Sequence, residues 1–388
     1  MLHFPFYKNS ISYIISQEKN ETRVSSERSL IINKAATMKE TARIAVVGAG
    51  WWACEFHIPH VLQNPNAELV SASRLGAKEL DHIKNRFGIP HVTENHREVY
   101  SQHPDGVIVS SPHTYHFEHA ATALENRCHV LVEKPMVTEI QEARDLSQMV
   151  EQSGKILMTP YGLNHTRFME QAADHVRDGQ IGEIKHIVLH MSSALMDLFG
   201  GEPMLETEKH LFRPPASTWA DPQRAGGYGW GQMSHALAAL FFVTGLEPMD
   251  IHAVAGKSPT GVDYFDAAIL RFTQDATGTI SGAAGLPKHC PPQLDLKVYG
   301  SEGMLLLDVE EGRERLQIRR FDGNDTIESM KLGEGYGSYS TQESINRFIT
   351  LCRDGQARNC GDHVVGAKTI QVLKAMYESI STSKTVTC

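Results

Sequence analysis

The first part of the chain alternates continuous apolar runs with amphipathic stretches. Between the runs, HFEHAATALENR (116–127) and IQEARDLSQMVEQSG (140–154) have apolar residues at helical spacing, and the second ends at a glycine stop. Strands alternating with helices predict a doubly wound parallel sheet, the Rossmann arrangement. The apolar runs, predicted as strands buried on both faces, cover residues 43–50, 67–73, 105–111, 129–135 and 155–161.

After Asn164 the pattern becomes that of an antiparallel sheet. A helix is predicted over 167–182, and two more helices close the chain at 340–355 and 364–383. The remaining segments are longer and rich in β-formers, and turn-like SEG and DG pieces join them as in hairpins. These predicted strands cover residues 183–193, 250–256, 265–285, 293–309 and 315–323.

The predicted fold class is therefore α/β plus α+β. We expect a Rossmann dinucleotide-binding domain over 42–161 and a second domain over 162–388 with a large, mainly antiparallel open sheet flanked by helices. The last helix is expected to pack back near the interdomain region. Residues 1–41 have neither pattern and lack the layout of a secretory signal, so we interpret them as a disordered extension, with Met38 as the functional start.

Composition and charge exclude several classes of protein. The 388 residues suffice for two cores, and a net charge of −9 without a long basic run disfavours nucleic acid as a partner. No apolar run approaches the about 20 residues that span a bilayer. The six cysteines form no CxxC pair and the 20 histidines show no metal-binding spacing, so we predict no metal. A cytoplasmic protein with reduced thiols is the expectation.

A glycine-rich turn follows the first predicted strand. Gly48-Ala49-Gly50-Trp51-Trp52-Ala53 is a GxGxxA sequence between a strand and a helix, which is where this motif binds a dinucleotide. Gly48 allows the tight turn, and Gly50 lets the backbone approach the pyrophosphate at the helix N-terminus. Trp51 and Trp52 are expected either over the cofactor and pocket mouth or in packing at the helix start.

The end of the second strand bears on the choice between NADP and NAD. An NAD site usually has Asp or Glu there, whereas this strand ends Ser73-Arg74 and no carboxylate appears before Glu79. Ser73 and Arg74 suit the 2′-phosphate of NADP. If Arg74 is instead a solvated surface residue, the site accepts either cofactor. NADP is the predicted cofactor, with NAD as the alternative.

The phrase HVLVEKP (129–135) brings two charges to the end of a buried strand. Glu133 and Lys134 stand at the carboxyl end, where open α/β sheets bind ligands. Burial of such charges is costly unless they are used. A lysine there can hold a substrate hydroxyl and exchange a proton. The alternative is a structural Glu–Lys pair.

Taken in order, these elements resemble the glucose–fructose oxidoreductase / inositol dehydrogenase / MocA (Gfo/Idh/MocA) family. The resemblance covers about residues 42–386 and includes SSPHTYHFEHAATAL (110–124), DGQIGEI (178–184) and YESISTSKTV (377–386). It implies a second domain that binds substrate and forms homodimers or homotetramers through its sheet. It also implies hydride transfer between NAD or NADP and a secondary alcohol or ketone of a sugar, glycoside or polyol.

The resemblance assigns roles to individual residues. Lys134 is the active-site lysine, and the nicotinamide side of the pocket is formed by Ser111, Pro112, His113, His116 and Glu133. For His116 a structural role is the alternative. Substrate contacts are expected at the crossover after the first domain, at Asn164. His165 is expected to be a solvent-facing loop histidine.

The segment AGGYGWGQMSH (225–235) departs from the family. The family pattern is GGG-x-L-x-D-x-G-x-H, and its Asp and His point into the pocket beside the lysine. Here the histidine is His235, the expected acid/base, but the position of the Asp holds Gly231. Gln232 or Tyr228 is expected to supply the missing hydrogen bond. Within the long irregular loop 196–227, Trp219 and Arg213 are candidate sugar contacts.

Two function classes follow. In the first, the protein is an NAD(P)-dependent oxidoreductase in which Lys134 holds the reacting oxygen and His235 exchanges its proton. In the second, it is an NADP-binding sensor or a catalytically inactive family member, because Gly231 replaces the active-site Asp. The retained lysine and histidine favour the first class.

Overall fold

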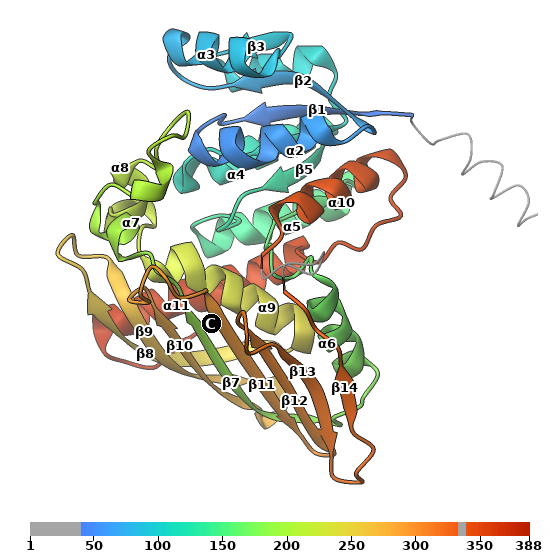
Figure 1. Ribbon diagram of the computed structural model, residues 1–388, viewed down its shortest axis with the longest axis vertical. Helices are drawn as coiled ribbons and strands as arrows, with labels where there is room; N and C mark the ends of the chain where they lie inside the picture. The colour runs from blue at the N-terminus through green and yellow to red at the C-terminus, as the bar shows by residue number, and fades with distance from the viewer. Residues whose placement is uncertain (1–39, 333–338) are drawn as a thin grey trace, which may run out of the picture.

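The computed structural model describes residues 40–332 and 339–388, and two sheets organise it (Figure 1). The first sheet has six parallel strands in the order β3-β2-β1-β4-β5-β6. The order reverses between β1 and β4, and ligands bind beyond the carboxyl ends of strands at such a point. The strands are β1 (Ala42–Val47), β2 (Ala67–Ser73), β3 (His91–Thr93), β4 (Gly106–Val109), β5 (His129–Val132) and β6 (Leu157–Met158).

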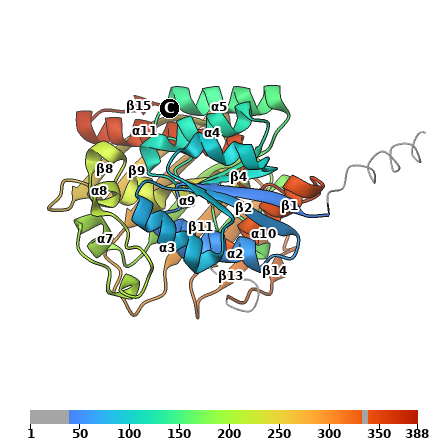
Figure 2. The ribbon, with the colours of Figure 1, turned by 90° about the horizontal axis from the view of Figure 1, so that it is seen from above.

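Helices cover both faces of this sheet, as parallel strands buried on both sides require. Seen from above, α4 and α5 lie on one face and α2, α3 and α10 on the other (Figure 2). The first-domain helices are α2 (Ile58–Gln63), α3 (Ala77–Phe87), α4 (His116–Glu125) and α5 (Ile140–Ser153), with a π-helical turn η1 (Ala53–His57) before α2 and short 3-10 turns η2 (His96–Gln102) and η3 (His113–Tyr115).

The second sheet has nine strands in the order β14-β13-β12-β11-β7-β10-β9-β8-β15. Only β7 and β10 pair in parallel, so the sheet is mainly antiparallel. The strands are β7 (Ile184–Ser192), β8 (Pro248–Lys257), β9 (Asp263–Phe272), β10 (Thr277–Ala283), β11 (Gln293–Gly300), β12 (Gly303–Val309), β13 (Arg315–Arg320), β14 (Thr326–Glu328) and β15 (Val386–Thr387).

The two faces of the second sheet differ. Helices α6 (Arg167–Arg177), α9 (Ser234–Thr244) and α11 (His363–Thr382) lie on one side of it in Figure 1. Residues of β9 alternate between buried and exposed along the strand, so its other side chains point away from these helices. On that outer face Val254 and Ile269 are each 60% exposed and Phe265 is 44% exposed.

Two C-terminal helices join the domains. Helix α11 packs against α5 of the first domain as well as against β8 and α9. Helix α10 (Thr341–Arg353) lies within the range expected for the second domain, but it packs on β1 and α2 of the first. Phe348 and Cys352 come so close to Gly106 of β4 that a side chain there would overlap them.

The connection from β7 to β8 is long and mostly irregular. It contains α7 (Met196–Gly200), α8 (Ala216–Trp219), the 3-10 turns η4 (Leu205–Thr207) and η5 (Pro222–Arg224), and a π-helical turn η6 (Gly229–Met233) that runs into α9. A further 3-10 turn, η7 (Thr273–Asp275), precedes β10. Among the helices of residues 40–332 and 339–388, none combines the length and apolarity needed to cross a bilayer.

Candidate active site

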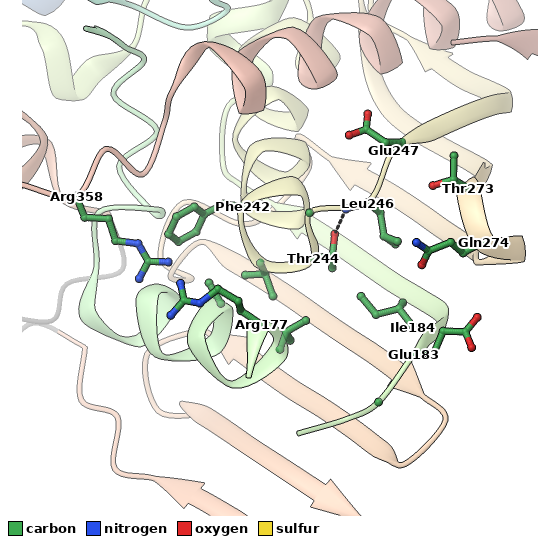
Figure 3. Close-up of a pocket in the computed structure, with 15 residues that line it drawn as sticks. Arg177, Glu183, Ile184, Phe242, Thr244, Leu246, Glu247, Thr273, Gln274 and Arg358 are labelled. Carbon is green, nitrogen blue, oxygen red and sulfur yellow. Dashed lines mark hydrogen bonds between the residues drawn. The ribbon is translucent and has the colours of Figure 1, made fainter. Parts of the chain in front are cut away.

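Two of the cavities in the structure have different surroundings, one within the second domain and one between the domains. One, of about 430 Å³, lies where α9 ends, and Figure 3 shows Arg177, Phe242 and Arg358 on one side of it and Glu183 and Glu247 on the other. It contains none of the residues that the sequence singles out. The other cavity, of about 670 Å³, lies between the two domains and brings Gly50, Lys134 and His235 together. We therefore take the interdomain cavity as the candidate active site.

The first-domain wall of this cavity comes from the carboxyl ends of β1, β4 and β5. A side chain at Gly48 would overlap the backbone of Ser111, so this turn packs tightly against the next strand. At Gly50, by contrast, a Cβ would meet only the Gly48 carbonyl oxygen, at 3.8 Å, and the backbone faces open space. This surface fits the pyrophosphate of a dinucleotide. The wall is lined by Gly50, Trp51, Trp52, Phe56, Ser110, Ser111, Pro112, His113, His116, Glu133 and Lys134.

Ser73 and Arg74 lie behind the glycine-rich turn and do not line the cavity. The Ser73 carbonyl accepts hydrogen bonds from the backbone N–H groups of Gly48 and Ala49. Arg74 donates from Nη1 to the Ala49 carbonyl at 3.2 Å, and its guanidinium lies 3.8 Å from the ring centre of Phe212. The Arg74 side chain is therefore half-buried and fixed by these two contacts, and it is not a solvated surface residue.

The two histidines that are expected beside the nicotinamide are held by backbone carbonyls. His113 donates from Nδ1 to the Ala225 carbonyl at 3.0 Å, which ties the cofactor wall to the glycine-rich segment. The ring nitrogens of His116 lie 2.7 Å from the Pro135 carbonyl oxygen and 2.8 Å from that of Ser111. Burial lowers the pKa of both rings, so each is neutral at pH 7 and His116 donates to one carbonyl at a time.

Glu133 has a partner that the sequence analysis missed. His57 Nε2 lies 2.7 Å from Glu133 Oε1, and the backbone N–H of Lys134 donates to Oε2 at 3.0 Å. Burial acts to raise the pKa of Glu133, but the hydrogen bond from His57 and the charges of His57 and Lys134 hold it below the ordinary value. The carboxylate is therefore ionised at pH 7, and both of its oxygens accept hydrogen bonds. Nothing in the sequence connects it to a histidine 76 positions earlier.

Lys134 extends across the cavity to the second domain. Its Nζ donates to the Gly231 carbonyl oxygen at 2.8 Å and lies 4.9 Å from the ring centre of Trp219. Burial lowers the pKa of the ammonium to about 8, against an opposing effect of Glu133. The group is mostly charged at pH 7 and close enough to neutrality to exchange a proton.

The carbonyl of Gly231 thus serves as the lysine's acceptor where the family has a carboxylate. A Cβ at Gly231 would lie 2.6 Å from the ring of Phe199 and 3.5 Å from Trp219. Phe199 is fully buried, so it fills the space that an aspartate side chain needs. The Gly231 carbonyl therefore stands in for the negative charge of the family's Asp, and the Phe199 ring occupies the space of its side chain.

His235 lies on the same helix, one turn after Gly231, and is 2% exposed. The rings of Tyr161 and Tyr339 stand perpendicular to it, with centres 6.0 and 5.2 Å away. Within the described chain, its Nδ1 has no hydrogen-bond partner. Burial and the Lys134 ammonium lower its pKa well below the ordinary value, so the imidazole is neutral and can accept a proton.

The structure places three residues of the second domain differently from what the sequence suggests. Asn164 is buried away from the cavity and donates from Nδ2 to the carbonyls of Ala238 and Cys360, at 3.2 and 2.9 Å. Tyr228 is also buried, and its hydroxyl donates to the Met191 carbonyl at 3.0 Å. His165 is 1% exposed instead of solvent-facing, and burial lowers its pKa to about 3. Gln232 does line the cavity.

The loop 196–227 covers the cavity and reaches the first domain. Trp51 Nε1 donates to His210 Nδ1 at 2.8 Å, and the Leu211 N–H donates to Glu55 at 2.9 Å. Trp219 lines the cavity, whereas Arg213 is exposed and does not. Among the described residues, no three His, Cys, Asp or Glu side chains are grouped to hold a metal ion.

Comparisons with known proteins agree with this architecture. Residues 42–161 match the oxidoreductase family with an NAD-binding Rossmann fold (GFO/IDH/MocA), and residues 169–306 match the GFO/IDH/MocA C-terminal domain. The D-glucoside 3-dehydrogenase of Escherichia coli K12 is 30% identical over 155 residues, which cover 39% of this chain and only 43% of that enzyme. The D-xylose 1-dehydrogenase [NADP(+)] of Haloarcula marismortui is 28% identical over 356 residues, 89% of this chain and 92% of the relative.

Solved structures share the fold at lower identity. A levoglucosan dehydrogenase in complex with NADH and levoglucosan has a TM-score of 0.71 at 16% identity, over 89% of this chain and 99% of that one. An oxidoreductase from Agrobacterium radiobacter in complex with NAD+, L-tartaric acid and magnesium has a TM-score of 0.71 at 17% identity, over 90% and 98%. With both domains matched by family models, the chain belongs to the Gfo/Idh/MocA family of oxidoreductases.

Proposed function

We propose that the protein is an NAD(P)-dependent oxidoreductase that transfers a hydride between nicotinamide and a secondary alcohol or ketone of a sugar, glycoside or polyol. The observation that carries the proposal is the pairing, in one interdomain cavity, of the Lys134 ammonium with the neutral imidazole of His235. Oxidation of an alcohol needs both a base for the hydroxyl proton and a cation for the developing negative charge.

The two side chains have separate roles in this scheme. His235 accepts the proton of the substrate hydroxyl. Its ring is buried and Nδ1 has no hydrogen-bond partner, so the imidazole is neutral until a bound substrate offers a proton. Lys134 donates a hydrogen bond to the same oxygen and stabilises the alkoxide. Bound nicotinamide supplies the hydride acceptor, or the donor in the reverse direction. Trp219 and the loop around it exclude water from the ammonium.

We propose NADP as the cofactor, with NAD as the alternative. Gly48, Gly50, Trp51 and Trp52 would hold the pyrophosphate, and the nicotinamide would lie along Ser111, Pro112, His113, His116 and Glu133. Ser73 and Arg74 would face the 2′-phosphate, since Arg74 lies against the glycine-rich turn, where it bonds the Ala49 carbonyl, and the sequence has no carboxylate between Ser73 and Glu79. The Haloarcula relative is named as an NADP(+) enzyme, whereas the Agrobacterium oxidoreductase and the levoglucosan dehydrogenase are complexes with NAD+ and NADH.

Among sugars, glycosides and polyols, the second-domain wall favours a glycoside with an apolar aglycone. This wall is largely apolar, and several of its polar groups are already paired: Gln293 bonds Ser192 and Glu310, and Lys288 bonds Asp197 and Glu206. A free sugar would leave hydroxyls unmatched there, whereas an apolar group would displace water. The apolar part of the wall consists of Leu163, Met191, Leu195, Leu198, Met204, Leu294, Pro292 and Val309.

We also propose that the chain forms a homodimer or homotetramer through the outer face of its second sheet. The exposed apolar side chains Val254, Phe265 and Ile269 lie on neighbouring strands β8 and β9 of that face. Exposed apolar surface of this kind favours contact with a second copy. Light scattering should give a mass above that of one chain, and Ile269→Lys should lower it.

A turnover assay distinguishes the oxidoreductase from an NADP-binding sensor. Purified protein is mixed with NADP or NAD and with a panel of polyols, free sugars and alkyl glucosides, and the nicotinamide absorbance is followed. We expect turnover that Lys134→Ala lowers by about 10²–10³-fold. Cofactor binding without turnover on any panel member, and no effect of Lys134→Ala, would favour the NADP-binding sensor, for which the loss of the carboxylate at Gly231 is the supporting observation.

A further inference from the structure

The helix that carries Gly231 and His235 is anchored at its start by two residues from other elements. The backbone N–H of Gly229 donates to Asp263 Oδ2 at 2.6 Å, and that of Trp230 donates to the Tyr377 hydroxyl at 3.2 Å. The Tyr377 hydroxyl in turn donates to Asp263 Oδ1 at 2.6 Å. The first N–H groups of a helix have no partner within it, and a carboxylate is favoured at this end. Asp263 of β9 therefore acts as a cap supplied by the tertiary structure.

Two glycines of the segment are explained by this anchor. A side chain at Gly227 would overlap the Asp263 carboxylate, and a Cβ at Gly229 would lie 2.5 Å from the Tyr377 hydroxyl. Only glycine lets the chain pass this close to the pair. Asp263 is 3% exposed, and the indole of Trp230 stacks on Tyr377 with ring centres 5.4 Å apart. Asp263 is thus buried, whereas Tyr377 is partly exposed and, with Asp263 and Trp230, lines a cavity of about 570 Å³.

The anchor lies next to the catalytic groups along the chain. Two residues after Gly229, the Gly231 carbonyl accepts the hydrogen bond from Lys134 Nζ at 2.8 Å. Four residues later, His235 follows on the same helix. Because this stretch is continuous helix, a displacement of its first turn moves the carbonyl and changes its distance to the lysine.

We propose that Asp263 and Tyr377 are positioning residues: they hold the helix start so that the Gly231 carbonyl stays within hydrogen-bond distance of Lys134 and favours its charged form. The inference rests on the proposed function for its catalytic meaning, but the contact it concerns is independent of any substrate.

Other titratable groups also face the lysine. Glu133 favours the ammonium, while His113, His116 and His235 are buried and neutral at pH 7. Asp266 faces Asp263, and burial together with the charge of that neighbour raises the pKa of Asp266 well above its ordinary value. A hydrogen bond from the ammonium to a carbonyl favours the charged form, so losing it must lower the pKa of Lys134.

The pKa of Lys134 can be measured without following enzymatic turnover. Acetic anhydride acylates only the neutral amine, so the pH dependence of labelling at the Lys134 peptide, followed by mass spectrometry, gives its titration midpoint. The full-length wild type is compared with Asp263→Ala, Asp263→Asn and Tyr377→Phe. Tyr264→Phe is the matched control, because it removes a neighbouring tyrosine hydroxyl that bonds the Met196 carbonyl.

We expect a wild-type midpoint near 8. Asp263→Ala should lower it by on the order of one pH unit, Tyr377→Phe should lower it less, and Asp263→Asn, which keeps an acceptor oxygen, should restore most of it. Equal midpoints in wild type, Asp263→Ala and Tyr377→Phe would overturn the proposal. If Asp263→Ala does not fold, the midpoint of Tyr377→Phe alone tests the proposal, because this substitution removes only the hydroxyl oxygen. A wild type without dehydrogenase turnover contradicts the proposed function and leaves these midpoints unaffected.

Discussion

Two glycine-rich segments meet the same interdomain cavity, and they differ in what lies where a side chain would be. At Gly50 that space is open, because a Cβ would meet only a carbonyl oxygen 3.8 Å away. At Gly231 it is filled by the ring of Phe199, and at Gly229 by the hydroxyl of Tyr377. At Gly50 the lack of a side chain leaves the backbone open to a ligand. At Gly229 and Gly231 it lets the side chains of Tyr377 and Phe199 pack against the backbone.

The comparison teaches that glycine counts do not identify a ligand site. Both segments precede helices, and both have glycines at alternate positions. Only the three-dimensional surroundings separate a surface left free for a dinucleotide from one closed by aromatic rings. The substitutions below use this difference.

The largest effect is expected at Gly231. Gly231→Ala should destabilise the protein by about 1–3 kcal/mol, since the new methyl group overlaps Phe199 in a packed interior. Phe199→Ala alone should cost about 3–5 kcal/mol because its ring is fully buried, but in that background Gly231→Ala should add little further cost. Urea unfolding of the two single variants and of the double variant measures the coupling. Additive effects of the two substitutions would contradict the packing argument.

At Gly50 the opposite pattern is expected. Gly50→Ala should leave the urea midpoint nearly unchanged, because the methyl group enters open space. It should weaken NADP binding about tenfold or more by keeping the pyrophosphate from the backbone. Calorimetric titration with NADP checks this, with Gly231→Ala as the reciprocal control. A destabilised protein with normal NADP affinity would show that this turn, too, is built for packing.

The pH dependence of oxidation tests the roles of Lys134 and of His235, which follows the second glycine-rich segment. Oxidation that needs the Lys134 ammonium should decline above pH 8 or so, where the lysine loses its proton, by about tenfold per pH unit. The acidic limb should lie well below 6.5, since His235 must stay neutral to accept a proton.

The double variant Gly231→Asp/Phe199→Ala places a carboxylate beside the ammonium. An opposite charge favours the charged form, so the pKa of Lys134 rises and the alkaline limb should move to higher pH. The limb is measured from kcat at saturating NADP and substrate. An unmoved limb would mean that another group governs it.

Sequence reasoning succeeded where local pattern and function coincide. The strand β2 has the predicted bounds, and the turn at Gly48 and the strand end at Lys134 lie where motifs and chain direction put them. The Rossmann sheet, the mainly antiparallel second sheet and the family were predicted and are confirmed. Short strands such as β3 and β14, of three residues each, gave no periodic signal.

It failed where a residue's role depends on distant partners. Asn164 looks like a substrate contact until the carbonyls of Ala238 and Cys360 are seen to occupy its amide. His57, Phe199 and Tyr339 carry no motif, yet they surround the charged groups of the cavity. Each is brought there by packing between elements that are distant in the sequence. His57 and Glu133, for example, are 76 residues apart.

Helix α10 has a consequence for biosynthesis. The apolar side chains of Ile345, Phe348 and Ile349 share one core with β1 and α2, although about 300 residues separate them along the chain. While the ribosome is still making the second domain, only α2 and α3 cover that face of the first sheet, and the part that α10 covers is exposed. The first domain is therefore completed only after most of the second has been made, and translation stalled before residue 341 leaves part of the Rossmann core exposed.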